Sequence, residues 1–238
     1  MKNNIRKIIK SKIPKTFRSA IQRCRGVSVY HHYYNDNKCI FIHIPKSAGQ
    51  SVGESLFNDR RPGHWSIRDF EWEDYSKFIS YKKFTFVRNP WDRLVSAYNY
   101  LINTSKYEKD VIFSKNVLSQ YADFEDFVLH GLRNPDVLAW VHFRTQVSFL
   151  KDSKNNINID YIGRFERIND DFNELCDRFN IDPISSLGKH NASIHQDYRD
   201  YYNEETKKIV FDVYREDVEL FGYCLLYTSP SPRDRYIS

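Results

Sequence analysis

The sequence predicts an α/β fold: a single domain with a central parallel sheet flanked by helices. Three observations predict this class. The chain has 238 residues, which is long enough to bury one sizeable core. With 41% hydrophobic and 28% charged residues, its composition is that of a folded globular protein. Short apolar runs alternate with helical patterns, and this alternation is typical of parallel βα units.

Three apolar runs are the predicted strands of the sheet, and they span residues 38–43, 82–88 and 159–165. Helical patterns follow each run, so the connections between strands are expected to contain helices. The predicted helices span residues 51–57, 92–102, 169–179 and 204–221. Asn203 precedes the last of these helices and is a residue type that caps helix N-termini.

Both ends of the chain differ from this middle part, and the predicted domain therefore spans residues 38–224. Residues 1–37 form a basic N-terminal extension, in which the first 25 residues contain nine Lys or Arg, no acid, and an apolar residue at every fourth position. This pattern suits contact with an anionic membrane surface, and it equally suits a solvated basic extension. Residues 225–238 lose all periodicity and are interpreted as a non-native or disordered tail.

Charge, cysteines and hydropathy limit the possible partners. A net charge of +5 suits anionic ligands and does not require nucleic acid, so no nucleic-acid partner is expected. The four cysteines lie far apart without metal-ligand spacing, so no metal is expected. No segment approaches the roughly 18 apolar residues of a membrane span, and no signal peptide is evident. These features predict a cytoplasmic protein, with peripheral membrane contact through the basic extension as the alternative.

The stretch "CIFIHIPKSAGQSVGESLF", residues 39–57, contains a candidate phosphate-binding loop. A strand that leads through a small-residue turn into a helix directs backbone N–H groups and the positive end of the helix dipole at one point. Gly49 permits close backbone approach, Ser47 and Ser51 add hydroxyl donors, and Lys46 adds a charge. The loop differs from the GxxxxGK[ST] pattern, because Lys46 precedes the glycine. An unspecific strand-to-helix turn is the alternative.

A second stretch, "FTFVRNPWDRLVSAYNYL", offers donors at the end of the next strand. Arg88 lies at the carboxyl end of that strand, and Ser96 falls in the early turns of the following helix. Parallel sheets bind ligands at this edge, and an arginine can fork onto a phosphate-like group while a serine donates beside it. Two such edges suit a ligand with two separated phosphate-like groups. Arg93, three residues before Ser96, is expected to pair with an acid, and assistance at the ligand site is the alternative.

These two motifs, "HIPKSAGQS" and "RNPWDRLVSAY", resemble the cofactor motifs of sulfotransferases that use 3′-phosphoadenosine 5′-phosphosulfate (PAPS), especially the carbohydrate branch related to heparan and chondroitin sulfotransferases. The stretches "HFRTQVSFL" and "IDYIGRFERINDDF", together with residues 189–223, resemble the bacterial members. The resemblance implies that the 5′-phosphosulfate is held by Lys46, Ser47, Ala48, Gly49, Gln50 and Ser51. It implies that Arg88 and Ser96 hold the 3′-phosphate. Gln50 departs from the family, which more often has threonine there.

The resemblance also implies a reaction: transfer of a sulfuryl group from PAPS to a hydroxyl of a glycan or glycolipid acceptor. Lys46 is suited to stabilise the charge that develops on the leaving phosphate oxygen. A histidine is the most suitable base for the acceptor hydroxyl, and His64 lies close to where related enzymes keep a catalytic histidine. Glu54 is the alternative base. His43 is expected to pack or to orient the turn, and the sequence does not place His142.

One further cofactor residue and two other function classes remain open at this point. Arg164 closes the third predicted strand, where it could reach the cofactor or pair with Glu166 or Asp160. A P-loop-type nucleotide kinase or NTPase would use a similar loop, but it requires an acidic Mg²⁺ ligand where this chain has Arg88. A non-catalytic polyanion-binding module would account for the basic extension without requiring two ordered motifs.

Overall fold

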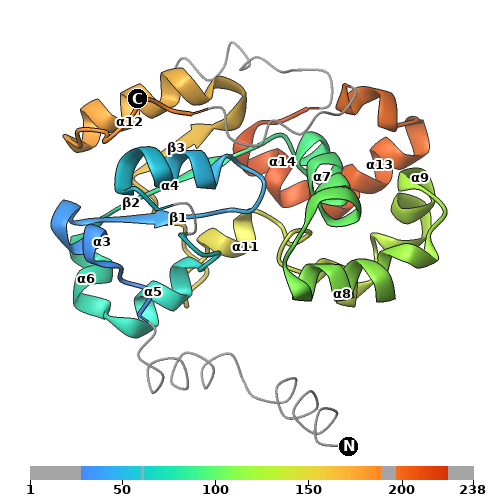
Figure 1. Ribbon diagram of the computed structural model, residues 1–238, viewed down its shortest axis with the longest axis horizontal. Helices are drawn as coiled ribbons and strands as arrows, with labels where there is room; N and C mark the ends of the chain where they lie inside the picture. Colours follow the sequence, from blue (N-terminus) through green and yellow to red (C-terminus); the bar gives the residue numbers. More distant parts are fainter. Residues whose placement is uncertain (1–27, 60–61, 189–196, 225–238) are drawn as a thin grey trace, which may run out of the picture.

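The computed structural model describes residues 28–59, 62–188 and 197–224, and it has the predicted α/β architecture (Figure 1). A parallel sheet with helices on both sides forms one half of the molecule, and helices alone form the other half. The predictions for the basic extension up to residue 27 and for residues 225–238 lie outside the described residues.

The sheet consists of β1 (Cys39–Ile42), β2 (Lys82–Val87) and β3 (Tyr161–Arg164), in that order and all parallel. The three predicted strands are thereby confirmed. Phe84 in the central strand is the partner of Phe41 on one side and of Tyr161 on the other. All residues of β2 after Lys82 are buried, as expected for a strand that is covered on both faces.

Helices of the first half cover both sides of the sheet. The helix α3 (His32–Asn37) precedes β1, and α4 (Gly49–Phe57), α5 (Ile67–Glu73) and α6 (Tyr75–Ser80) connect β1 to β2. α12 (Ile168–Phe179) follows β3 and lies on the opposite side of the sheet from α5 and α6 (Figure 1). Tyr33 and Tyr34, which the sequence assigned to the extension, are buried in the same hydrophobic cluster as the strands.

The second half is helical and has its own hydrophobic cluster, which includes Leu94, Phe127 and Val210. Its longer helices are α7 (Pro90–Asn99), α8 (Glu108–Asn116), α13 (Glu204–Val213) and α14 (Arg215–Phe221). Shorter helices of this half are α9 (Phe124–Asp126) and α10 (Pro135–Leu138), with helical turns at Tyr100–Thr104, Leu118–Gln120, Phe127–Gly131 and Tyr198–Tyr201. The helix α11 (Val147–Leu150) packs instead in the cluster of the strands, and a further helical turn at Phe165–Arg167 follows β3. Within the described ranges, no helix has the length and apolar character that a membrane span requires.

Two predicted helices differ from the structure: one begins earlier than expected, and the other is interrupted. α7 begins earlier than expected, at Pro90, because the Asn89 side chain accepts a hydrogen bond from the Trp91 N–H at 3.1 Å. The prediction of one helix over residues 204–221 is wrong: Tyr214 (φ −105°, ψ 23°) separates α13 from α14, and its hydroxyl donates to the Phe143 carbonyl at 2.8 Å. The predicted cap is confirmed, since the Asn203 side chain accepts from the Thr206 N–H.

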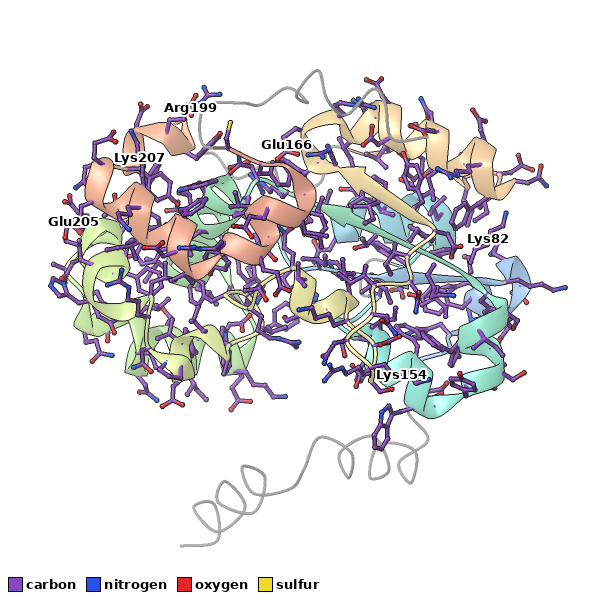
Figure 2. All side chains as sticks on the ribbon, turned by 180° about the vertical axis from the view of Figure 1, so that it is seen from behind. Lys82, Lys154, Glu166, Arg199, Glu205 and Lys207 are labelled. Atoms are coloured by element: carbon purple, nitrogen blue, oxygen red, sulfur yellow. The ribbon has the colours of Figure 1, made fainter. Side chains whose placement is uncertain are left out.

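The carboxyl ends of the strands face the helical half of the molecule. Figure 2 shows Lys82, the first residue of β2, on the outer side of the sheet, and Glu166, just beyond β3, on the side of α13 and α14. Both predicted ligand motifs begin at this inner edge, because one follows β1 and the other follows β2. The junction of the two halves is therefore where a site built from them must lie.

Candidate active site

The turn between β1 and α4 has an unusual backbone. Lys46 (φ 69°) and Ala48 (φ 61°) both have left-handed conformations. Each such conformation costs a non-glycine residue about 1 to 3 kcal/mol, persists only where the surroundings hold it, and is common at ligand sites. Ala48 is the N-cap of α4 and has no polar side chain, so it cannot accept from the first N–H groups of the helix. The turn therefore presents uncapped helix N–H groups.

Ser47 supplies a test of whether an anion fits this turn. Its side chain is 1% exposed, and its Oγ is buried without a hydrogen-bond partner among the described residues. Burying a hydroxyl without a partner is unfavourable, and such groups in folded proteins are normally satisfied. Ser51, in the first turn of α4, is also buried. A phosphate-like oxygen at this turn would satisfy the Ser47 hydroxyl, so the residues present fit an anionic group.

Lys46 lies where this turn meets the helical half. Its Nζ is 4.1 Å from the centroid of the Tyr100 ring, which follows α7 in the chain. Burial, together with the nearby positive charge of Arg88, lowers the pKa of Lys46 to about 8, and Asp110 acts in the opposite direction. The Lys46 ammonium group is held over the Tyr100 ring by a cation–π contact. The carboxylate of Asp110 favours its charged form.

Arg88 joins the two predicted motifs directly. Its Nη1 donates to the Lys46 carbonyl at 3.0 Å, and its Nε and Nη2 donate to the two carboxylate oxygens of Asp92 at 2.7 and 2.8 Å. The guanidinium carbon lies 4.0 Å from the centroid of the Phe165 ring. These bonds use three of the five N–H donors of an arginine, so two remain for a ligand. The forked face of Arg88 is bonded to Asp92, and a phosphate would meet the remaining donors.

Two residues of α7 follow Arg88 into the helical half. Ser96 is 1% exposed and lies on α7, which begins at the carboxyl end of β2. Arg93 is equally buried, and within the described ranges its guanidinium bonds to backbone carbonyls rather than to the expected acid. Its Nη1 donates to the carbonyl of His142 at 3.2 Å and its Nη2 to the carbonyl of Arg144 at 2.6 Å. Arg93 therefore fixes the loop that carries His142 onto α7.

His43 and His64 bind to each other's segments. The Nδ1 of His43 lies 2.9 Å from the Gly63 carbonyl, and the Nδ1 of His64 lies 3.3 Å from the His43 carbonyl. A carbonyl only accepts, so both rings carry the proton on Nδ1 and have Nε2 as the free acceptor. Burial, and after it the nearby His142, lowers the pKa of His64 to about 4. His64 is thereby held as a neutral imidazole, which is the form that a proton acceptor requires.

His43 packs on the turn, which is one of the two roles that the sequence suggested for it. Burial holds its pKa well below the usual range, so its ring is neutral. A Cβ placed on Gly49 would lie 1.7 Å from the His43 Cδ2, which shows that the ring packs directly on the first residue of α4. His43 therefore connects the phosphate-type turn with the segment that carries His64.

The structure adds three residues that the motifs did not identify: Tyr100, Asp110 and His142. The ring of His142 lies 5.8 Å from that of His64 and 5.1 Å from that of Tyr100, between ring centroids. Asp110 on α8 is 3.4 Å from the His142 Nε2. His142 had a signal in the sequence, since it opens the stretch "HFRTQVSFL". Asp110 had none, because α8 was not among the predicted helices.

Two further residues predicted for the site are Arg164, the last residue of β3, and Glu54 on α4. The Nη2 of Arg164 donates to the Phe221 carbonyl at 2.7 Å, and its guanidinium lies over the Tyr223 ring. Glu166 accepts instead from the Asn89 N–H and the Tyr223 hydroxyl, and Asp160 accepts from the Lys83 N–H, so neither is the partner of Arg164. Glu54 is half-buried on α4. Within the part of the chain described, no group of three or more His, Cys, Asp or Glu could hold a metal ion.

Comparison with known proteins identifies the family. The family model described as "Sulfotransferase family" matches residues 32–224. Human carbohydrate sulfotransferase 9 is 23% identical over 179 residues, which are 63% of this chain and 39% of the human protein. The chain thus aligns with well under half of the length of that relative. No solved structure matches the chain. Since the family model covers most of the chain, including both motifs at the junction of the two halves, this protein belongs to the sulfotransferase family.

Proposed function

We propose that this protein transfers a sulfuryl group from PAPS to a hydroxyl of a carbohydrate. The observation that carries the proposal is the turn after β1, where the Ser47 hydroxyl, which has no partner among the described residues, lies between two residues with left-handed backbone, Lys46 and Ala48. Arg88 donates to the carbonyl of Lys46, so the second motif supports the first. Membership of the sulfotransferase family supports the same reading.

The phosphosulfate end of the donor would be held by Lys46 and by the residues from Ser47 to Ser51. Bound PAPS supplies an activated sulfuryl group whose leaving atom is a phosphate oxygen. The ammonium of Lys46 favours negative charge at that position, and it does so more strongly as the charge develops. Ser47 and the N–H groups at the start of α4 act in the same direction. Arg88 and Ser96 would hold the 3′-phosphate at the end of β2, and Arg164 remains a predicted contact with an internal partner of its own.

His64 is the proposed general base. Its Nδ1 faces a carbonyl, so Nε2 carries the lone pair that takes the proton of the acceptor hydroxyl. The pKa of about 4 keeps this nitrogen unprotonated over the physiological range. Glu54 is the alternative base, since a carboxylate on α4 could also face an acceptor above the turn.

A glycan or glycolipid is the proposed acceptor class. The name of the human relative, a carbohydrate sulfotransferase, supports a sugar hydroxyl, although identity to this chain is low. Contact with a membrane surface through the basic residues before residue 26 remains a proposal from the sequence, as does a cytoplasmic location.

Transfer of radiolabelled sulfate tests the function directly. The protein is incubated with ³⁵S-labelled PAPS, a chelator of divalent metal ions and a panel of glycans, and label in the glycan fraction is measured. We expect transfer without added metal, and we expect strongly reduced transfer for the variant His64→Ala. Label transferred from ATP only with Mg²⁺ would favour a nucleotide kinase and contradict the proposal. Binding of glycans without transfer of label would favour a polyanion-binding module.

A further inference from the structure

Asp110 is a buried carboxylate at the candidate site that the proposed mechanism has not used. It lies in the first turn of α8 and is 7% exposed. Its Oδ2 accepts from the Ser105 hydroxyl at 2.9 Å and lies 3.4 Å from the His142 Nε2. Bonds from His142 and Ser105 outweigh the effect of burial and lower the pKa of Asp110, so it is an anion. A buried anion normally has a cationic or hydrogen-bonded partner that accounts for it.

Asp110 fixes the tautomer of His142. An ionised carboxylate can only accept, so the Nε2 of His142 carries its ring proton. The other ring nitrogen, Nδ1, is therefore an acceptor, and it is buried without a partner among the described residues. Arg93 holds the backbone of the same residue through its carbonyl. His142 is thus fixed at the ring by Asp110 and at the backbone by Arg93.

The charge of Asp110 also acts on the two groups assigned to catalysis. It raises the pKa of Lys46 and of His64, as well as that of His142. The other charged or titratable groups around them oppose it: Arg88 lowers the pKa of Lys46, while His142 and Lys46 lower that of His64. His43, on the other side of His64, is neutral. Lys46 and Arg88 thus bring positive charge to this site from the ends of two strands, and Asp110 on α8 opposes it.

We propose that Asp110 is a positioning residue of sulfuryl transfer: it orients His142 beside His64, and its charge stabilises the cationic forms of His64 and Lys46. The proposal rests on the proposed function, because it assigns Asp110 to the same reaction. When His64 Nε2 takes the proton from the acceptor hydroxyl, a second cation forms close to the Lys46 ammonium. The carboxylate of Asp110 offsets that repulsion and takes no proton itself. Without it, His64 is a weaker base and Lys46 loses its proton at lower pH.

The variant Asp110→Asn tests this through the pH dependence of kcat/KM, which reports the groups of the free enzyme. In the wild type, His64 must be unprotonated and Lys46 protonated, so the alkaline limb lies near the pKa of Lys46, about 8. Removing the negative charge lowers both values, so we expect both limbs to move to lower pH by about one unit or more. The maximum of kcat/KM should fall by roughly 10- to 100-fold. Affinity for adenosine 3′,5′-bisphosphate (PAP) at pH 6, where Lys46 is protonated, should stay within about threefold.

A matched control exists on the surface. Asp126 is bonded to His130, four residues later in the chain, at 2.7 Å in an Asp–His pair at the surface. Asp126→Asn removes the same charge from the same kind of pair, and it should leave the pH profile unchanged. Asp110→Glu restores the charge, and it should return the alkaline limb toward its wild-type position. Loss of activity in Asp110→Asn without movement of either limb would show a purely structural role and overturn the proposal.

Nuclear magnetic resonance of the histidine rings gives a readout that needs no activity. The wild type should show His142 with its proton on Nε2, and Asp110→Asn should show lower pKa values for both His64 and His142. Assignments come from His64→Gln and His142→Gln. A proton on Nδ1 of His142 in the wild type would overturn the proposal, even if Asp110→Asn does not fold. If Asp110→Asn lowers the pKa values of the histidines but the wild type transfers no sulfate, the proposed function is overturned. The positioning role of Asp110 in sulfuryl transfer is then overturned with it.

Discussion

His43 and His64 show how single residues prepare the site before any ligand binds. Each ring donates from Nδ1 to a carbonyl in the segment of the other, so the two rings, 4.3 Å apart between centroids, fix each other's tautomer. His64 is itself half-buried, whereas His43 is buried and packs against Gly49. The two histidines thus differ in their surroundings: the His43 ring packs on the turn, and the His64 ring, donating from Nδ1, keeps its lone pair on Nε2.

His64→Ala should separate chemistry from nucleotide binding. We expect turnover to fall by roughly 10² to 10⁴, because a general base acts on the acceptor hydroxyl. PAP affinity should remain near the wild-type value, because the nucleotide is assigned to Lys46, Ser47 and Arg88. Calorimetry measures the affinity, and labelled sulfate measures turnover. His130→Ala, at an exposed histidine, is the control. Near-normal turnover in His64→Ala would mean that the base is elsewhere, and Glu54→Gln would be the next variant to measure.

Arg88→Ala should have the opposite pattern, with a loss of nucleotide affinity. The variant removes the two N–H donors assigned to the 3′-phosphate. It also removes the bond to the Lys46 carbonyl, so it weakens the turn assigned to the 5′-phosphate. A lost charge-assisted bond costs on the order of 1.5 to 3 kcal/mol, which raises the Kd for PAP by about 10- to 150-fold. Arg215→Ala removes an exposed arginine that is also bonded to an aspartate, and it should leave the Kd unchanged. Equal effects of the two variants would remove Arg88 from the proposed site.

At this scale the sequence identified residues that lie within continuous motifs. Lys46, Ser47 and Gly49 were predictable because a strand, a small-residue turn and a helix follow one another within 19 residues, from 39 to 57. Asp110 and His142 were not, because the segment between β2 and β3 contains many short helices whose packing decides which side chains meet. The prediction of an acidic partner for Arg93 was wrong for the same reason, because its carbonyl acceptors come from a loop about 50 residues later in the chain.

At the scale of elements, the sequence predicted regular patterns and missed their interruptions. The three strands lie in short segments rich in apolar and aromatic residues, and of these only β1 is uniformly apolar, yet each segment was distinct enough from its helical neighbours to be located. The break at Tyr214 was not visible, because the apolar residues continue at helical spacing through both α13 and α14. A tertiary hydrogen bond from Tyr214 to Phe143 accompanies the break, and tertiary contacts of this kind cannot be read from local periodicity.

The contact between β1, α4 and the segment before α5 can be tested at Gly49. An alanine there is compatible with the helix and would by itself favour it by up to about 1 kcal/mol. Its Cβ, however, would lie 1.7 Å from the His43 Cδ2, so the ring must move and its bond to the Gly63 carbonyl is lost. We expect Gly49→Ala to lower the melting temperature and to reduce both PAP affinity and turnover.

A double variant isolates the cause of that effect. In the background of His43→Ala the clash is absent, so Gly49→Ala should cost little further stability. The four proteins of this cycle are compared by chemical denaturation. Additive losses of stability in the double variant would show that the close approach of His43 is not what requires a glycine at position 49.

At the scale of the whole molecule, the candidate site joins two hydrophobic clusters. One contains the strands with α3, α4, α5 and α12, and the other contains the helices that lie beside them in Figure 1. Lys46 and His64 belong to segments of the first half, whereas Ser96, Asp110 and His142 belong to the second. A ligand held by the turn after β1 and by α7 would contact both halves. Its binding energy would therefore stabilise their association as well as the site itself.

PAP should consequently stabilise the whole protein against thermal unfolding. At a concentration about 100 times its Kd, a ligand that binds only the folded state adds about 2.7 kcal/mol. For a chain of this length that gain corresponds to a rise in Tm of roughly 5 to 11 °C. A nucleotide without the 3′-phosphate, such as 5′-AMP, should give a smaller shift, and Arg88→Ala should reduce the difference between the two nucleotides. The measurement is a thermal-shift series at fixed protein concentration with PAP, 5′-AMP and ATP plus Mg²⁺. A clear rise with ATP and Mg²⁺ and none with PAP would contradict the PAPS assignment, because the turn after β1 would then hold a triphosphate and the end of β2 would hold no 3′-phosphate.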